Sequence, residues 1–373
     1  MATLRGQPVD RPPVCFYEIN GHDQNPLNGD PFNIYSHPSW APLIELAREK
    51  TDRILMRGVP LKNAPPDPVA PFQTYESHLE GGSQITTSTI RAGGRVLTSR
   101  WRRDPDIDTV WTIEHLLKNA DDLRAWLELP EPEIGGQPDI SAVLKAEHEI
   151  GDTGIVCIDT ADPLCCVAPM FDLGEFTVVA ATEPELFHTA LQRFSRAIIA
   201  HVAAVAKALP GRLWRICGPE YASPPYLPPR LFREYVTAYD TPMVQAIQQH
   251  GGFARIHCHG RIKDILDDIA ATGCVGLDPI EPPPQGDVQL SWVRERYGRQ
   301  MVLFGNLEAS DIENLPACEF EKKIAAALRE GTAGIGRGFV LMPSACPYGR
   351  VLSERALNNY RKMIEMVEGQ HGK

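Results

Sequence analysis

The stretch ARIHCHG (residues 254–260) is a short β-rich run that ends in two histidines and a glycine. On a strand, side chains two positions apart point to the same side, so His257 and His259 are expected on one face and Cys258 on the other. The run CVGLDPI (274–280) follows it, after a segment of helix length. This order of strand, helix and strand is typical of neighbouring parallel strands in one sheet.

Six further β-rich runs resemble these two. They are VCFYE (14–18), RILMR (53–57), GIVCID (154–159), LWRICG (213–218), MVLFGN (301–306) and GFVLMPS (338–344). Segments with helical apolar spacing lie between the later runs, and 182–209 is the clearest of them. Eight strands alternating with helices predict an α/β fold, a single (β/α)8 TIM barrel over residues 1–373. A doubly wound open sheet is the alternative, but no glycine-rich phosphate loop follows the first run.

One region interrupts the alternation. The segment QITTSTIRAGGRVLTSRWRRD (84–104) is expected to form two strands around Gly93 and Gly94, a β-hairpin at about 84–103 inserted between barrel strands 2 and 3. We interpret it as a lid over one barrel mouth with solvated arginines. A docking face for an acidic partner protein is the alternative.

The composition is that of an ordinary globular protein, with 43% hydrophobic residues and a net charge of -11. Such an acidic chain argues against nucleic acid or an anionic membrane as the main partner. The N-terminus lacks the apolar core of a signal peptide, and no window has the length of a membrane span. Nine cysteines without a CxxC pair indicate a reducing compartment, so we expect a cytoplasmic protein.

In TIM barrels the catalytic side chains lie at the carboxyl ends of the strands. Here the predicted strand ends carry a crowd of polar side chains, which a purely structural barrel would avoid because buried polar groups need partners. They are Glu18, Arg57, Asp159, Glu220, His257, His259, Asp278, Glu281, Asn306 and Cys346. Imidazole, carboxylate and thiolate are zinc ligands, so one hypothesis is a zinc site made of His257, His259, Glu281 and Cys346. Histidines hydrogen-bonded within the barrel core are the alternative.

Several stretches are similar to one known superfamily. They are GPEYASPPYLPPRLFREYV (218–236), RIHCHGRIKDILDDIAATGCVGLDPIEPPPQGDV (255–288), VLFGNLE (302–308) and GFVLMPSACPY (338–348). On these the chain resembles the uroporphyrinogen decarboxylase superfamily, in its branch of methylcobamide:coenzyme M methyltransferases and corrinoid-dependent O-demethylases. The zinc site of that branch has a His-x-Cys pair, a glutamate on the next strand and a late cysteine. Carried over, these positions are His257, Glu281 and Cys346, with His259 in place of the first cysteine, which makes the site one unit more positive.

The resemblance implies a zinc-dependent methyltransferase. It would move a methyl group between a small methylated or methoxylated substrate, or a thiol, and the cobalamin of a separate corrinoid protein. The chain itself lacks the Asp-x-His-x-x-Gly pattern of a corrinoid-binding domain. A homodimer is considered because dimers occur in the superfamily.

The remaining strand-end residues receive roles from their chemistry. Glu220 is expected to orient the substrate or a ligand histidine, or else to cap the following turn. Asp278 is expected to act as a base or as an alternative metal ligand, and Asn306 as a hydrogen-bond donor to the substrate. The predicted substrate-binding side chains are Tyr17, Glu18, Arg57 and Asp159.

Two rival functions stay open at this point. A metal-free decarboxylase of the same fold would need an arginine-rich signature near the first strand to hold carboxylates, and residues 15–35 contain no arginine. A non-catalytic barrel that binds zinc and a small molecule is the second rival, and the sequence does not discriminate against it.

Overall fold

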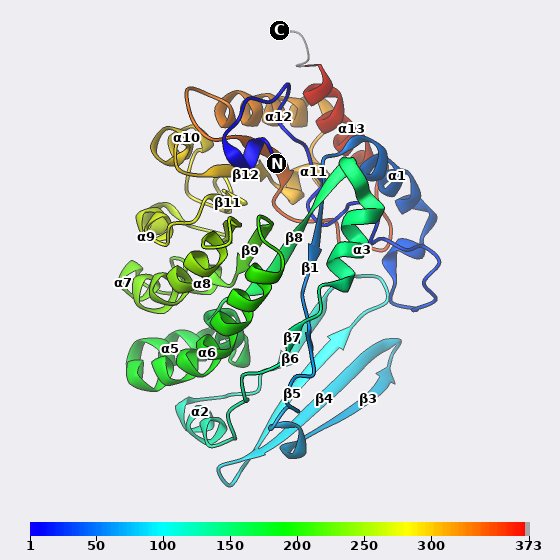
Figure 1. Cartoon of the computed structure of the whole chain (residues 1–373). Helices are drawn as coiled ribbons and strands as arrows, with labels where there is room; N and C mark the ends of the chain where they lie inside the picture. The colour runs from blue at the N-terminus through cyan, green and yellow to red at the C-terminus, as the bar shows by residue number, and fades with distance from the viewer. Residues whose placement is uncertain (370–373) are drawn as a thin grey trace.

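A seven-stranded parallel sheet forms the centre of the computed structural model, which describes residues 1–369. The sheet has the order β1-β8-β9-β10-β11-β12-β13 and curls into a TIM-barrel-like α/β fold (Figure 1). Its strands are β1 (Arg53–Arg57), β8 (Gly154–Ala161), β9 (Leu213–Cys217), β10 (Phe253–His257), β11 (Gly276–Asp278), β12 (Val302–Leu307) and β13 (Phe339–Pro343). Seven of the eight predicted runs are therefore confirmed as strands.

The first predicted run, 14–18, does not form a strand. Val14 makes only an isolated parallel bridge to Leu341 of β13, and its carbonyl accepts a hydrogen bond from the Asp52 amide at 2.8 Å. Prolines precede this stretch, and Tyr17 has a φ of 55°, so the extended conformation ends after a few residues. The stretch nevertheless lies between β13 and β1 and connects the two edges of the curled sheet.

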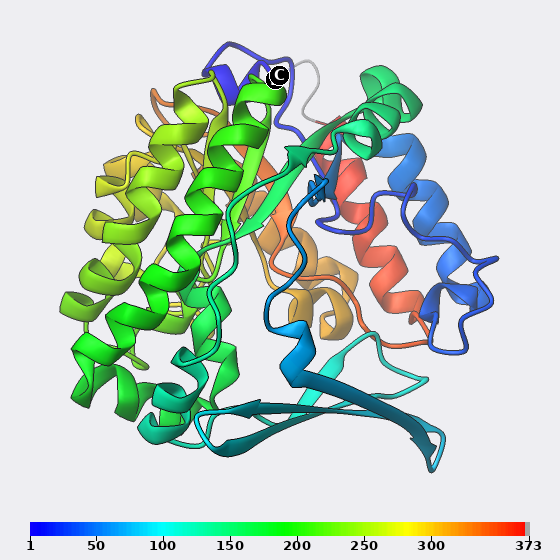
Figure 2. The ribbon, with the colours of Figure 1, turned by 60° about the horizontal axis from the view of Figure 1, so that its bottom comes forward.

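The helices lie outside the sheet (Figures 1 and 2). They are α1 (Ala41–Lys50), α2 (Ala120–Leu127), α3 (Ser141–Ile150), α4 (Pro163–Val167), α5 (Leu173–Thr182), α6 (Pro184–Ala208), α7 (Pro229–Phe232), α8 (Ala238–Gln248), α9 (Leu266–Ala271), α10 (Leu290–Tyr297), α11 (Ala309–Asn314), α12 (Ala317–Gly331) and α13 (Glu354–Glu368). Helix α6 matches the predicted 182–209 but begins at Pro184, because Thr182 ends α5. No helix among the described residues is long and apolar enough to cross a membrane.

The segment between β1 and β8 forms a separate antiparallel sheet with the order β3-β4-β5-β6 (Figure 2). Its strands are β3 (Gln73–Glu80), β4 (Ser83–Ala92), β5 (Arg95–Arg103) and β6 (Val110–Glu114). Strands β4 and β5 pair across Gly93 and Gly94, so the inserted region is a four-stranded sheet rather than a lone hairpin. Three of its arginines form ion pairs within the chain and are not simply solvated: Arg95 with Asp122, Arg102 with Asp104, and Arg103 with Asp30. A short pair, β2 (Leu61–Lys62) with β7 (Gln137–Pro138), flanks this insertion.

Alternation along the strands separates two apolar cores. One core fills the barrel interior and includes Ile54, Cys157, Leu213, Phe304 and Met342. The other packs the outer face of the sheet against the helices and includes Leu55, Val156, Trp214, Ile256 and Leu303. Because every second residue points inward, the polar side chains at the carboxyl ends of the strands also lie in the barrel interior. They lie above the apolar residues of the first core.

Candidate functional site

Two histidine–carboxylate pairs stand side by side where β10 and β11 end. The His257 Nδ1–H donates to Oδ2 of Asp278 at 2.8 Å, and Nδ1 of His259 contacts Oε1 of Glu281 at 2.8 Å. The two imidazole rings lie 4.6 Å apart between centroids and are nearly perpendicular. With each Nδ1 bound to a carboxylate, the two Nε2 atoms have no hydrogen bond to any of residues 1–369 and are the free positions of the rings.

Backbone geometry places these carboxylates. Residue 257 lies in register with residue 278 across the β10–β11 pair, so the first contact is a neighbouring-strand contact. After β11 the chain turns at Ile280, which has a φ of 57°. That turn brings Glu281 back to the β10 loop, where its Oε2 also accepts the Gly260 N–H at 2.7 Å.

Charge pairing keeps both carboxylates ionised. Burial by itself would raise the pKa of Asp278, but the charges of Arg255 and His257 outweigh it and lower the pKa to about 2. Arg255 contacts the same carboxylate at 3.0 Å, and both side chains are almost fully buried. Burial likewise opposes ionisation of Glu281, yet its hydrogen bond with His259 lowers the carboxyl pKa and raises the imidazole pKa.

A second polar group in the barrel interior is built on Arg215, in the middle of β9. Its guanidinium binds both oxygens of Asp159 at 2.6 and 3.0 Å and donates to the Tyr17 hydroxyl. The Tyr17 ring stacks on His257 with centroids 6.0 Å apart, and Oε1 of Glu18 lies 4.0 Å from Arg215. Three of the four predicted substrate-binding side chains therefore meet at Arg215. Sequence reasoning missed this arginine, although its place between Leu213 and Cys217 in β9 marks it as inward-facing.

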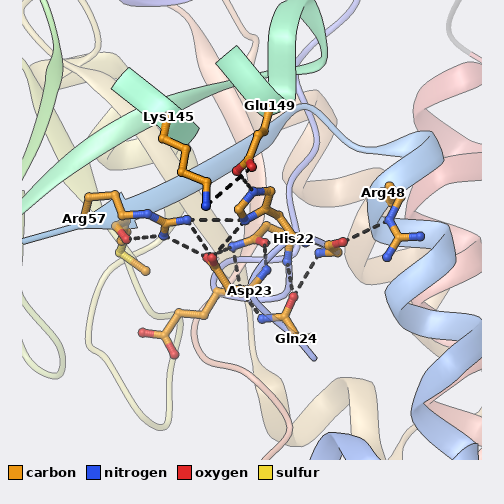
Figure 3. Close-up of polar contacts among 11 residues, drawn as sticks. His22, Asp23, Gln24, Arg48, Arg57, Lys145 and Glu149 are labelled. Atoms are coloured by element: carbon orange, nitrogen blue, oxygen red, sulfur yellow. Dashed lines mark hydrogen bonds and ion pairs between the residues drawn. The ribbon is translucent and has the colours of Figure 1, made fainter. Parts of the chain in front are cut away.

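Arg57 was predicted beside them and lies elsewhere. It shares the outward face of β1 with Leu55, and its guanidinium binds Asp23 at 2.7 and 3.0 Å (Figure 3). His22 bridges this pair to Glu149 of α3 through an Nε2 contact of 2.9 Å. The alternation of the strand thus sends Arg57 into a network that anchors the loop after Val14, outside the barrel mouth.

Cys346 follows β13 and is also separate from the histidines in its contacts. Its Sγ accepts the Glu18 N–H at 3.3 Å, and burial raises the thiol pKa well above its usual value. Among residues 1–369, no group of three or more His, Cys, Asp or Glu side chains is arranged to hold a metal ion. The predicted fourfold ligand set is therefore not gathered here, and Glu281 is turned toward His259. Asn306 is half-buried at the end of β12.

A cavity of about 710 Å³ opens beside the histidine pairs. His259, Glu281 and Glu220 share its lining, and Glu220 is held by a hydrogen bond of 3.1 Å from the Gly218 N–H. The inserted sheet reaches the same cavity through Thr112 and the following His115. Aromatic side chains make up much of the remaining lining: Phe171, Phe176, Tyr221 and Tyr226. Tyr221 and Tyr226 belong to the stretch GPEYASPPY. Phe171 and Phe176 follow β8, and no sequence motif marked them as cavity residues.

Glu308, directly after β12, is a further residue that sequence reasoning missed. Its side chain is buried, and Oε2 accepts the Ser344 hydroxyl at 3.3 Å. Burial, followed by the negative charge of Glu281, raises its pKa to about 7. The signal available in the sequence was its place at the end of the run VLFGNLE.

Comparison with known families matches the model of uroporphyrinogen decarboxylase (URO-D) to residues 114–369. The chain belongs to the uroporphyrinogen decarboxylase family. The matched region starts at the last residue of β6 and contains Arg215, both histidine–carboxylate pairs and Cys346. It leaves out Tyr17, Glu18 and most of the inserted sheet.

Among solved structures, a methyltransferase from Methanosarcina mazei is similar over 98% of this chain and 96% of its own, with a TM-score of 0.58 and 16% sequence identity. At that identity the likeness shows the fold alone. Comparison with curated proteins gives no match.

Proposed function

We propose that the chain is a zinc-dependent methyltransferase that moves a methyl group from a methoxylated small molecule to a corrinoid protein. The observation that carries the proposal is the pair of imidazoles whose Nδ1 atoms are held by carboxylates at the edge of an aromatic cavity. Histidines that bind zinc characteristically have their second ring nitrogen fixed in this way by a carboxylate. A methyltransferase activity is supported by the methyltransferase from Methanosarcina mazei, which has the same fold.

The two Nε2 atoms would hold zinc, as two of the three or four protein ligands that such a site uses. Asp278 and Glu281 fix the ring orientation and strengthen the imidazoles as donors. Glu281 and Cys346 remain predicted ligands, although in this structure Glu281 contacts His259 and Cys346 accepts the Glu18 N–H. A zinc ion held there would supply Lewis-acid chemistry to the ether oxygen of the substrate.

The chain's own residues bind and orient the substrate. Phe171, Phe176, Tyr221 and Tyr226 provide apolar faces for a flat ring, and a cavity of about 710 Å³ accommodates a small aromatic ether. Glu220, which lines the cavity together with His259, is available to accept a hydrogen bond from a substrate hydroxyl. The cobalt of a separate corrinoid protein would accept the methyl group at the barrel mouth.

A decarboxylase acting on a polycarboxylate has less support. Such a substrate needs cationic side chains free to bind it, as anion recognition generally does. The two buried arginines of the barrel interior are already neutralised, Arg215 by Asp159 and Arg255 by Asp278, and the cavity lining adds a single arginine, Arg261.

The test is the metal content of purified protein, measured by elemental analysis for the wild type and three variants. We expect about one zinc per chain, as for a single mononuclear site, and its loss in His257→Ala and His259→Ala. The matched control is His115→Ala, because His115 lines the same cavity but its Nδ1 contacts the Pro169 carbonyl at 2.9 Å. Folded protein that takes up no zinc on reconstitution would overturn the proposal. Zinc binding without demethylation of methoxylated aromatics by any corrinoid protein would favour the non-catalytic barrel.

A further inference from the structure

A second cavity lies at the opposite end of the barrel from the histidine pairs, at the amino ends of the strands. Its volume is about 150 Å³, and it shares no lining residue with the larger cavity beside His259. Much of its wall is apolar and comes from five strands of the central sheet: Ile54, Ile155, Leu213, Phe304 and Val340. The proposed methyl transfer makes no use of this space.

Arg53, the first residue of β1, lines this cavity and has few partners. The residue is only 8% exposed. One of its terminal nitrogens donates to the Thr153 hydroxyl, while the buried Nε has no hydrogen-bond partner. None of residues 1–369 forms an ion pair with this guanidinium. Arg53 is therefore a buried cation for which the described chain supplies a single neutral acceptor.

The other three buried arginines of residues 1–369 are satisfied within the chain. Arg255 has a carboxylate at 3.0 Å. Arg193 donates to three backbone carbonyls, and Arg294 donates to two. Burial, followed by the charge of Arg48, lowers the pKa of the Arg53 guanidinium, whereas a carboxylate partner would raise it. Because a buried charge is costly without compensation, Arg53 is suited to bind an anion from outside the chain.

Two carboxylates of the same cavity do not supply the missing counter-ion. Oδ2 of Asp52 is bound by Arg11 at 2.6 Å and by the Val14 N–H at 2.9 Å. Asp152 is exposed to solvent. The cavity therefore combines an uncompensated guanidinium with a largely apolar wall.

We propose that this cavity binds a small monocarboxylate with a short apolar body. The carboxylate pairs with Arg53, whose planar fork of N–H groups matches two carboxylate oxygens, and the apolar body packs against side chains such as Ile54 and Leu213. A volume of about 150 Å³ equals the liquid volume of about five water molecules, which limits the ligand to roughly the size of butyrate. The inference is independent of the methyltransferase proposal.

Ligand-observed NMR with butyrate tests the site, and butyramide is the neutral isostere. The wild type should bind butyrate saturably and butyramide about tenfold more weakly or less, because the amide cannot form the charge-assisted pair. Arg53→Met keeps the apolar stem and should weaken butyrate binding to the level of the amide, whereas Arg53→Lys should restore part of it. Arg261→Met is the matched control, since it removes the arginine of the larger cavity and should leave butyrate binding unchanged.

Three results would overturn the proposal. They are equal binding of butyrate and butyramide, loss of butyrate binding in Arg261→Met but not in Arg53→Met, and no binding of butyrate by the wild type. Inorganic phosphate is titrated in parallel. Binding of phosphate without binding of butyrate would contradict the proposed ligand class.

Thermal unfolding gives a second readout. Butyrate should raise the Tm of the wild type and of Arg261→Met, because a ligand that binds only the folded state stabilises it. It should leave the Tm of Arg53→Met unchanged. Without ligand, Arg53→Met should be at least as stable as the wild type, because it removes an uncompensated buried charge. A large loss of stability in ligand-free Arg53→Met would show that the chain itself satisfies Arg53, and would contradict the proposal.

Discussion

At the scale of single residues, the site depends on buried charges that satisfy one another. Asp278 is the central one, because it binds His257 and Arg255 at once and has no exposed surface. The sequence indicated Asp278 as a base or a metal ligand. The structure gives it a positioning contact, which follows from the register between β10 and β11.

Asp278→Asn should destabilise the fold by about 3–5 kcal/mol, because it leaves the Arg255 charge buried without its counter-ion. Denaturant unfolding at pH 7 measures this change in the free energy of unfolding. The control is Asp268→Asn, whose partner Arg233 is 65% exposed, so that its loss should cost about 1 kcal/mol or less. Equal losses in the two variants would contradict the assignment of Asp278 as a buried counter-ion.

Glu308 makes the free energy of unfolding depend on pH, and its pKa is raised where that of Asp278 is lowered. Its pKa of about 7 in the folded protein is above the unfolded value, so the folded state binds more protons and stability falls as the pH rises from about 4.5 to 7. Glu308→Gln should therefore raise the free energy of unfolding by about 1–3 kcal/mol at pH 8. The gain should vanish near pH 4.5. Unfolding curves at both pH values measure it, and a gain that does not depend on pH would argue against a protonated Glu308.

At the scale of elements, strand ends and the turns after them place the functional side chains. Gly218 links β9 to the turn that carries Glu220, with a φ of 128°. A Cβ at this position would lie 2.0 Å from Oδ1 of Asp162 and 2.5 Å from Cβ of Cys165. Neither neighbour has room to move, because Asp162 is buried and caps α4 through the Cys165 amide.

Gly218→Ala should lower stability by more than about 2 kcal/mol, since backbone strain and a steric clash add. Gly251→Ala is the matched control, because Gly251 has a φ of 72° but nothing within 4 Å of the added carbon. Its cost should be about 1 kcal/mol, from backbone strain alone. Thermal unfolding of both variants tests the difference, and similar melting temperatures would contradict the clash.

At the scale of the whole molecule, the curled sheet is closed by a stretch with very little strand structure. Val14 connects β13 to β1, and Asp52 holds it: Oδ2 of Asp52 accepts the Val14 N–H at 2.9 Å and an Arg11 contact at 2.6 Å. Closure therefore rests on a few backbone hydrogen bonds and on the Asp52 side chain rather than on a full strand ladder.

Asp52→Ala should loosen this seam and cost about 1–2 kcal/mol, because the Val14 amide loses its acceptor. Native-state hydrogen exchange should show faster exchange at the Cys15 and Leu341 amides, which bond across the seam. The amide of Ile256 in β10, on the far side of the sheet, should be unaffected. Uniform acceleration over the whole sheet would contradict a local role.

The sequence by itself determined the seven strands of the central sheet and the family, and it predicted that His257 and His259 share one side of their run. Strand positions could be predicted because each depends on a local run of β-rich residues, and the face of His257 followed from a period of two. The same local rule failed at 14–18, where prolines and a turn override β propensity.

Only the tertiary structure decided which carboxylate binds which imidazole. It also decided that Arg215 contacts Tyr17 and Asp159, and that Arg57 points outward to Asp23. Aromatic residues from distant segments line one cavity for the same reason. These contacts join residues far apart in the chain, and they depend on strand register and on the path of turns such as that at Ile280. A sequence pattern fixes the side of a strand on which a residue lies, whereas packing between elements selects its partner.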